Sequence, residues 1–329
     1  MTALDKSNNK IWKSARLIAK YCTFAYASII MNHSTRTSYI SMGTWIRQRL
    51  GGRVQKIAVN AGFTCPNRDG TVGTGGCIFC NNEAFNPSYC DPRMSVREQI
   101  EVGKRFFAHK YTEARYLVYF QAFSNTYAPL AHLKQLYEEA LSVEGVVGLV
   151  IGTRPDCVDA PLLEYLGELR KRTFVMIEYG VESCDDDILR RIHRGHTFAC
   201  SQDAIRQSHE AGLYVGVHVI LGLPGDTQEI WHRQAEALSA LPIDVLKIHQ
   251  LQIIKGTPLA HCYAEKPFHL FTADEYVQVL TDYIRHLRSD IVLERFVSES
   301  PSRLLVAPKW GLKPQVIVER VNRLLATQS

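Results

Sequence analysis

Four of the nine cysteines lie within 26 residues, and their spacing suits a metal centre: Cys65, Cys77, Cys80 and Cys90. The C-x-x-C separation of Cys77 and Cys80 lets two thiolates meet at one metal ion or cluster. The loop back to Cys65 contains four glycines, so it can turn sharply enough to bring in a third thiolate. Two centres stay open at this point, an iron–sulfur cluster on the first three cysteines and a zinc site on all four.

Three thiolates leave one iron of a [4Fe–4S] cluster without a protein ligand. Such an open iron can chelate the amino and carboxylate groups of S-adenosylmethionine (SAM) and hold its sulfonium beside the cluster. One electron delivered into the S–C bond then yields a 5′-deoxyadenosyl radical, which abstracts hydrogen from a substrate. The protein supplies orientation and excludes water. This interpretation predicts a SAM-cleaving enzyme with two cofactors, the cluster and SAM.

The elements that would position these cysteines follow from the hydrophobic pattern. From Val54 onward, short apolar runs alternate with longer amphipathic ones, which is typical of parallel sheets with helical crossovers. Strands are predicted over residues 54–59, 116–121, 146–151, 174–179, 213–221 and 245–251. Helices are predicted over residues 95–109, 129–141, 160–170, 203–211 and 228–240. The fold class is therefore α/β, a partial (β/α)6 TIM-like barrel.

We expect three segments along the chain. Residues 1–50 have no period that leads into the barrel, so we expect an N-terminal extension, and translation could begin at Met1, Met31 or Met42. Residues 51–260 form the core. Residues 261–329 form a small C-terminal α/β extension, with helices predicted at 272–287 and 316–326 and a short strand at 291–296.

Charge and hydropathy exclude some classes of protein. No run reaches the ~18 uncharged apolar residues of a membrane-spanning helix, and the longest candidate is residues 21–31. We expect no membrane partner and a cytoplasmic location, because cluster-forming cysteines need a reducing compartment. The net charge of +5 comes from residues 1–40, and the remainder carries 32 basic and 32 acidic residues. No overall field therefore attracts a polyanion.

The unusual motifs all fall where strands are predicted to end. Cys65 follows the first strand, and the later strands end at or lead into QAFSNTY, GTRPD, EYGVES, ILGLPGDT and HQLQIIKGT. Catalytic residues of parallel barrels gather at the carboxyl ends of the strands. A zinc knot predicts no such convergence, so this pattern favours the cluster.

The sequence resembles the YhcC-like group of radical SAM proteins, related to the elongator-type and oxygen-independent coproporphyrinogen dehydrogenase-like branches. The resemblance runs from about Gly52 to the last helix and is carried by GGRVQKIAVNAGFTCPNRDGTVGTGGCIFCNN, EYGVESCDDDILRRIHRGHT and GLPGDT. It implies a barrel of the radical SAM type, a SAM-cleaving cluster on Cys65, Cys77 and Cys80, and an electron donor such as flavodoxin or ferredoxin. It gives no substrate.

The resemblance also implies SAM contacts at matching positions. Phe79 corresponds to an aromatic residue near the adenine, with ordinary core packing as the alternative. Glu182 and His218 correspond to contacts with the ribose hydroxyls, and Arg194 to a contact with the SAM carboxylate, which its guanidinium fork matches. The alternative for Glu182 and Arg194 is a buried ion pair. Arg154 is a further candidate with the same chemistry as Arg194.

The chain departs from the commonest radical SAM pattern in two places. Eleven residues, instead of three, separate the first two cluster cysteines, and the second strand lacks the Gly-Gly-Glu that receives the SAM amino group. Gln121, Ser124 and Asn125 are the available replacements. Gly222 permits close approach of the cofactor. Cys90 has no assigned role. A spare thiol is the favoured interpretation, with a ligand for another metal or a substrate-side residue as alternatives.

Three functions stay open. Kinship to the elongator-type branch and a basic C-terminal stretch favour a radical enzyme that modifies tRNA. The other branch suggests small-molecule chemistry, such as a tetrapyrrole-like oxidation. The third is a zinc-stabilised RNA-binding protein without turnover. The basic residues of the C-terminal stretch are Arg303, Lys309, Lys313, Arg320 and Arg323, and a solvated helix face is the alternative interpretation of this stretch.

Overall fold

A single curved parallel sheet forms the centre of the computed structural model, which describes residues 39–84, 86–108 and 115–327. Within these residues eight strands are hydrogen-bonded in the order β1-β9-β7-β6-β5-β4-β3-β2, and every neighbouring pair is parallel. The strands are β1 (Ile40–Ser41), β2 (Val54–Val59), β3 (Arg115–Phe120), β4 (Val146–Thr153), β5 (Phe174–Glu182), β6 (Tyr214–Leu221), β7 (Val245–Gln250) and β9 (Val292–Arg295). The predicted partial parallel barrel is confirmed.

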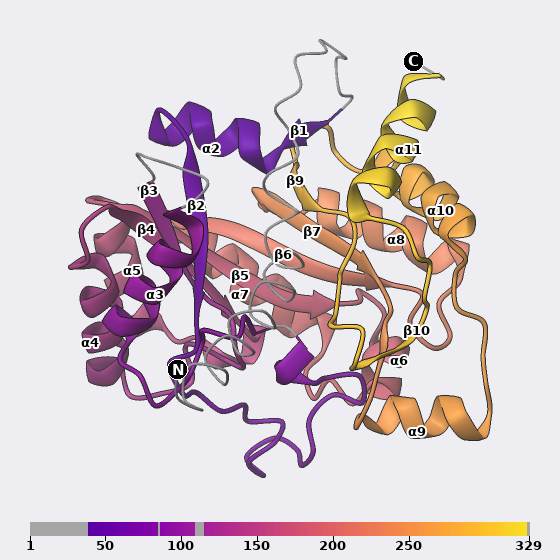
Figure 1. Ribbon diagram of the computed structural model, residues 1–329, viewed down its shortest axis with the longest axis horizontal. Helices are drawn as coiled ribbons and strands as arrows, with labels where there is room; N and C mark the ends of the chain where they lie inside the picture. The colour runs from indigo at the N-terminus through magenta and orange to yellow at the C-terminus, as the bar shows by residue number, and fades with distance from the viewer. Residues whose placement is uncertain (1–38, 85, 109–114, 328–329) are drawn as a thin grey trace, which may run out of the picture.

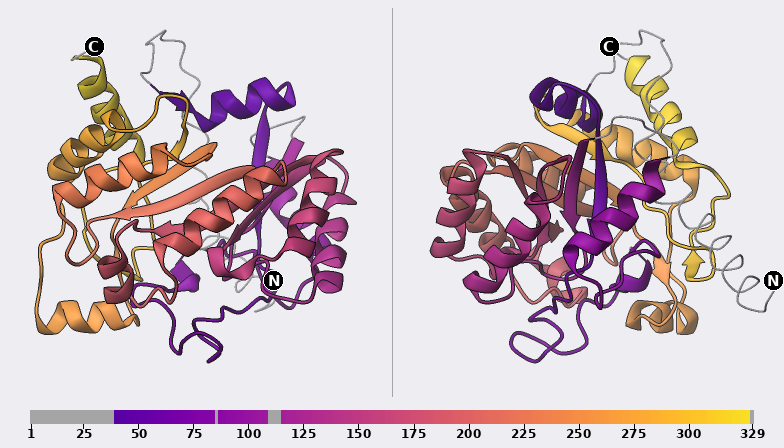
Figure 2. Two further views of the ribbon diagram at one scale, coloured as in Figure 1. Left: turned by 180° about the vertical axis from the view of Figure 1, so that it is seen from behind. Right: turned by 60° about the vertical axis from the view of Figure 1, so that its left-hand side comes forward.

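Helices cover the outer face of the sheet (Figures 1 and 2). The described helices are α2 (Met42–Leu50), α3 (Val96–Ala108), α4 (Leu130–Leu141), α5 (Ala160–Arg170), α6 (Asp186–Arg191), α7 (Phe198–Glu210), α8 (Gln228–Ser239), α9 (Pro258–Glu265), α10 (Ala273–Arg285) and α11 (Pro314–Ala326). Fully buried Val and Ile side chains of the strands pack against their apolar faces in one large core. None of the helices in the described part of the chain is long and apolar enough to cross a membrane.

Threonine caps begin four of the helices that follow strands or loops. The side chains of Thr197, Thr227, Thr257 and Thr272 each accept a hydrogen bond from a first-turn amide of α7, α8, α9 and α10. Pro258 sits at the first position of α9, where its fixed φ suits a helix. The Gly256-Thr257-Pro258 sequence therefore starts a helix that the hydrophobic pattern alone did not predict.

Helix α2 closes the amino end of the barrel. The Trp45 ring packs edge-on against Phe174 and Tyr214, with ring centroids 5.9 and 5.0 Å apart. Met42 and Ile46 join the same interior cluster. Residues 40–50, which we expected to precede the core, thus form β1 and α2, and we call α2 the barrel plug because it closes the amino end of the barrel. Residues 1–38 lie outside the described residues, as do the 21–31 run and the candidate starts Met1 and Met31.

The C-terminal residues also contribute to the main sheet. Strand β9 pairs with both β7 and β1, and β10 (Leu305–Ala307) pairs antiparallel with β8 (Ile253–Ile254). Helices α10 and α11 pack on the large core. The division into segments at residues 50 and 260 stays a prediction.

Candidate functional site

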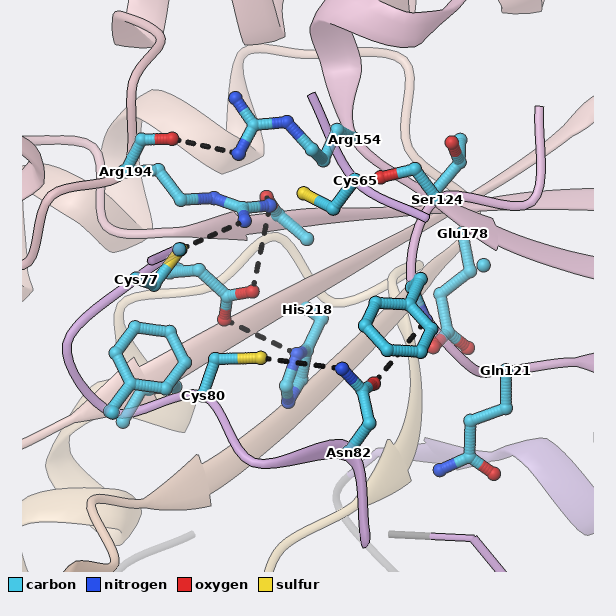
Figure 3. Close-up of a pocket in the computed structure, with 18 of the residues that line it drawn as sticks. Cys65, Cys77, Cys80, Asn82, Gln121, Ser124, Arg154, Glu178, Arg194 and His218 are labelled. Atoms are coloured by element: carbon cyan, nitrogen blue, oxygen red, sulfur yellow. Dashed lines mark hydrogen bonds and ion pairs between the residues drawn. The ribbon is translucent and has the colours of Figure 1, made fainter. Parts of the chain in front are cut away.

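A cavity of about 180 Å³ lies inside the barrel, toward the carboxyl ends of the strands. Its lining includes ten of the residues predicted from the sequence: Cys65, Cys77, Phe79, Cys80, Gln121, Ser124, Arg154, Glu182, Arg194 and His218. Figure 3 shows the three cysteines on one side of this cavity, with Arg194 between Cys65 and Cys77. The predicted convergence of motifs from separate strands is therefore present in the structure.

Two asparagines next to the cysteines point their amides at sulfur atoms. Asn67 Nδ2 lies 3.6 Å from Cys77 Sγ, and it also donates to the His193 carbonyl at 2.6 Å. Asn82 Nδ2 lies 3.7 Å from Cys80 Sγ (Figure 3). Sequence reasoning missed both residues. The sequence feature that could have identified them is their position, because each follows one of the three predicted cluster cysteines by two residues, in CPN and CNN.

Glycines in the cysteine loop leave space for neighbouring side chains. A side chain at Gly73 would meet Asn67 Oδ1 at 2.5 Å, and one at Gly76 would meet the Arg68 guanidinium at 2.9 Å. Gly76 also has a positive φ of 84°. Arg68 in turn donates to the Cys80 carbonyl at 3.0 Å. These glycines let the loop fold over Asn67 and Arg68, which fix the thiols in place.

The described cysteines are not gathered around one point, as the ligands of a single zinc ion would be. Cys90 lies outside the cavity lining and donates to the Ala58 carbonyl at 3.2 Å. Among the described residues, no three cysteines bring their sulfur atoms within 4.8 Å of one another, as ligands of one ion must. Burial, together with the neighbouring Cys77, raises the pKa of Cys80 to about 11. Metal coordination would deprotonate such a thiol.

Glu182, His218 and Arg194 form a buried polar group beside the cysteines. Glu182 Oε2 lies 3.3 Å from His218 Nδ1, and Oε1 lies 3.8 Å from Arg194 Nη2. Arg194 Nη1 lies 3.4 Å from Cys77 Sγ, and Nη2 donates to the Gly180 carbonyl. Arg194 Nε and His218 Nε2 are buried without a hydrogen-bond partner among the described residues. Buried polar atoms of this kind usually have a partner, so these two suit a polar ligand.

The backbone at Glu182 is unusual. Its φ is 67°, in the left-handed region that non-glycine residues rarely adopt, and the β5–β6 register shifts between Gly180 and Glu182. This irregularity directs the carboxylate into the cavity. Burial would raise the pKa of Glu182, but His218 and Arg194 outweigh burial, so the pKa is lowered.

The other predicted contacts differ in their surroundings. Arg154 is fully engaged, with Asp156 at 2.7 Å and with the Arg194 carbonyl at 2.8 Å, so it positions the Arg194 loop. Ser124 Oγ is buried without a hydrogen-bond partner among the described residues. Asn125 lies outside the cavity lining and donates to the Phe120 and Gly152 carbonyls.

Gly222 is also outside the cavity lining. A side chain at Gly222 would meet the Phe271 ring at 2.8 Å, and its φ is 88°. Packing against Phe271 and a positive φ both favour glycine at this position, and close approach of the cofactor stays a prediction.

A second polar layer lies deeper in the same cavity. Lys247 Nζ lies 2.7 Å from Glu178 Oε1 and 2.9 Å from the Tyr119 hydroxyl, which itself donates to Glu178 Oε1 at 2.5 Å. Arg295 lines the cavity next to this triad. Sequence reasoning missed this layer as a site. The sequence feature that could have identified this layer is a charged residue inside an otherwise apolar strand, as in FVMIEY and VLKIHQ.

A partial parallel barrel whose first strand leads into a three-cysteine loop is the arrangement of radical SAM proteins. Residues 65–236 match the family model of the radical SAM superfamily, and residues 243–326 match the radical SAM C-terminal domain. The chain belongs to the radical SAM superfamily, whose enzymes use a [4Fe–4S] cluster and SAM.

Curated relatives agree with this assignment. The chain is 35% identical to protein YhcC of Escherichia coli (strain K12) over 266 residues, which is 80% of this chain and 85% of that protein. It is 31% identical to YtqA of Bacillus subtilis (strain 168) over 292 residues, 89% of this chain and 91% of that protein. The resemblance to the YhcC-like group is confirmed.

Elongator-type proteins are similar over parts of their length. The chain is 27% identical to a tRNA uridine(34) acetyltransferase of Methanocaldococcus infernus over 138 residues, 41% of this chain and 25% of that protein. The solved structure of M. infernus Elp3 lacking residues 1–46 superposes with a TM-score of 0.60 at 18% identity, covering 82% of this chain and 63% of that one. The structural likeness establishes a shared fold.

Proposed function

We propose that this chain is an enzyme that reductively cleaves SAM at a [4Fe–4S] cluster held by Cys65, Cys77 and Cys80. When bound, such a cluster supplies the electron that breaks the S–C bond of SAM, and the resulting 5′-deoxyadenosyl radical removes hydrogen from the substrate. The observation that carries the proposal is the shared cavity, in which the three thiols meet a carboxylate and a guanidinium with unsatisfied polar atoms.

The cavity residues have distinct proposed roles. Arg194 binds the SAM carboxylate, because it lines the cavity and its buried Nε has no hydrogen-bond partner among the described residues. Glu182, positioned by His218, accepts hydrogen bonds from the ribose hydroxyls. Phe79 packs against the adenine, and Ser124 with Gln121 receives the amino group. Asn67 and Asn82 donate hydrogen bonds to the cluster ligands, which tune the reduction potential of a cluster.

The proposed substrate is tRNA, and the proposed electron donor is a flavodoxin or ferredoxin in the cytoplasm. Support for tRNA comes from the name of the M. infernus relative and from the basic C-terminal stretch. Two of these residues are already paired, Arg303 with Glu83 at 2.7 Å and Arg320 with Asp274 at 2.5 Å. Lys309, Lys313 and Arg323 are the remaining basic residues of the stretch.

Anaerobic reconstitution tests the SAM chemistry. The wild-type protein should bind iron and sulfide and release 5′-deoxyadenosine from SAM when reduced with dithionite. Cys80→Ser should lose both properties, whereas Cys90→Ser, outside the cavity, should keep them. A colourless protein that binds one zinc ion and leaves SAM intact would contradict the proposal, as would equal loss in the two variants.

Binding of tRNA tests the substrate class. Affinity that falls steeply with salt, and that falls further in Lys313→Glu and Arg323→Glu, would support tRNA, because phosphate contacts release counterions. Affinity that is indifferent to salt would argue for a small-molecule substrate. Exposed Arg206→Glu on α7 provides the control for charge reversal elsewhere.

A further inference from the structure

The deeper polar layer of the barrel contains five charged side chains. Two of them form an ion pair, Lys56 with Glu294 at 2.6 Å, and Lys247 forms another with Glu178 at 2.7 Å. Arg295 is the fifth. Among the described residues it has no ion pair and no hydrogen bond, and its Nε is buried. Two pairs and one extra guanidinium leave the layer with one uncompensated positive charge.

A bulge places this guanidinium beside another cation. Along the β7–β9 pair the register is Leu246 with Leu293 and then Lys247 with Arg295, so Glu294 is the extra residue. The bulge lets both Glu294 and Arg295 reach the barrel interior. Like charges directly opposite each other on adjacent strands are destabilising. Arg295 therefore lies where an anion would be stabilised, and no acidic side chain of the described residues forms an ion pair with it.

Of the nearby titratable groups, only Glu299 can offset that charge, and it does so without an ion pair. Burial raises the pKa of the Tyr119 hydroxyl, and burial with the neighbouring His218 lowers the pKa of His249, so both are neutral at neutral pH. Glu299 is the other acid that interacts with Arg295, and burial raises its pKa to about 7. Glu299 is not in the cavity lining and makes no hydrogen bond to Arg295 in the described structure.

The layer is open toward the proposed SAM site. Gly180 lies between Glu178 and Glu182 on β5, and a side chain there would meet Glu182 Oε1 at 2.6 Å. Gly152 lines the same cavity on the neighbouring strand. Four residues along β5 separate the two layers by about 13 Å. A ligand that touches Arg295 therefore shares one continuous space with the residues assigned to SAM.

We propose that Arg295 binds a carboxylate of the substrate at the floor of the cavity, beside the Lys247–Glu178–Tyr119 triad. The inference rests on the proposed function, since it places the substrate opposite SAM. One uncompensated positive charge matches a carboxylate better than a doubly charged phosphate. The planar guanidinium fork matches the two carboxylate oxygens. The substrate, whether a modified nucleoside in tRNA or a small molecule, then carries a carboxylate near the hydrogen that is removed.

Acetate is the probe for this site. The melting temperature of the anaerobic holoenzyme, saturated with SAM, is measured while sodium chloride is replaced by sodium acetate or sodium phosphate at constant ionic strength. A ligand that binds only the folded protein raises this temperature. Acetate should raise the melting temperature more for the wild type and for the control Arg206→Gln than for Arg295→Gln. The last variant should show only the general effect of the salt. Arg295→Lys should be intermediate.

Several results would overturn the inference. They are an equal acetate shift in Arg295→Gln and wild type, an Arg295-dependent shift that is larger with phosphate than with acetate, or an Arg295-dependent acetate shift that is seen only when SAM is left out. The last would assign Arg295 to SAM. A purely structural role of Arg295 is tested by melting the proteins without acetate. If Arg295 has that role, Arg295→Gln melts well below the wild type under this condition. Wild-type protein that fails to cleave SAM would contradict the proposed function instead, so the two failures are distinguishable.

Discussion

Glu182 Oε2 lies 3.3 Å from His218 Nδ1, and the strained left-handed backbone of Glu182 is what brings the two side chains together. Strain of this kind persists only where the surroundings enforce it, and it is common at ligand sites. The neighbouring Gly180 on β5 leaves room for the arrangement, because a side chain there would meet Glu182 Oε1 at 2.6 Å and Arg194 Nη2 at 2.7 Å.

Glu182→Gln should weaken SAM binding about ten- to a hundredfold. The substitution keeps the shape but removes the charge that strengthens hydrogen bonds to hydroxyls, worth about 1.5–3 kcal/mol. Equilibrium binding of SAM to the reconstituted protein measures this, with exposed Glu168→Gln as the control. Unchanged SAM affinity would mean that Glu182 and Arg194 form only a buried ion pair.

Asn82→Ala should make the reduction potential of the cluster more negative. The amide of Asn82 points at Cys80 Sγ from 3.7 Å, and such hydrogen bonds stabilise the added electron. A redox titration followed by the cluster absorbance measures the change. Asn81→Ala is the matched control, because Asn81 binds the Lys255 carbonyl and the Glu83 amide instead of a sulfur atom. Equal potentials in the two variants would argue against the assigned role.

Asp226→Asn should stabilise the protein at pH 7.5 by about 1–3 kcal/mol. Burial raises the pKa of Asp226 to about 6, so the folded state holds this proton more tightly than the unfolded state does. Stability from this group is present below about pH 4 and is lost as the pH rises through 6. Asn keeps the acceptor for the Gly222 and Leu223 amides.

Thermal melts at several pH values measure this effect. The advantage of Asp226→Asn should shrink steadily as the pH falls from 7.5 toward 4. An advantage that is constant with pH, or a loss of stability at pH 7.5, would show that burial of the charge is not the cause. Exposed Asp187→Asn should show no comparable trend.

Trp45→Ala should cost about 3–5 kcal/mol of unfolding free energy, because it removes a large buried side chain from the barrel plug. Urea unfolding measures the loss, and half-exposed Leu312→Ala should cost far less. A loss below about 1 kcal/mol would mean that α2 is not integral to the barrel.

The hydrophobic pattern predicts the central sheet well. The six predicted strands agree with β2 to β7 to within three residues at each end, because each strand is a nearly continuous apolar run. Parallel connections then place Cys65, Glu182 and Arg194 at one end of the barrel. Helix α2 escaped prediction because its apolar residues are few and it follows no strand pattern.

The deeper layer was beyond sequence reasoning for a physical reason. Lys247 and Arg295 meet through a one-residue register shift between strands that are far apart in the sequence. A shift of one residue moves side chains to the other face of a sheet, and no local pattern records it. The packing of Gly222 against Phe271 was likewise beyond sequence reasoning, because the two residues are far apart in the sequence.

The order of the strands separates two tasks along the chain. Every residue proposed to hold the cluster or SAM lies between Cys65 and His218, on β2 to β6 and the loops between them. Arg295 arrives on β9, from the last tenth or so of the sequence, and β9 lies next to the edge strand β1, on the side of the sheet opposite β2. Residues around β9 are therefore where substrate choice should be engineered, since no residue assigned to the cluster or to SAM lies there.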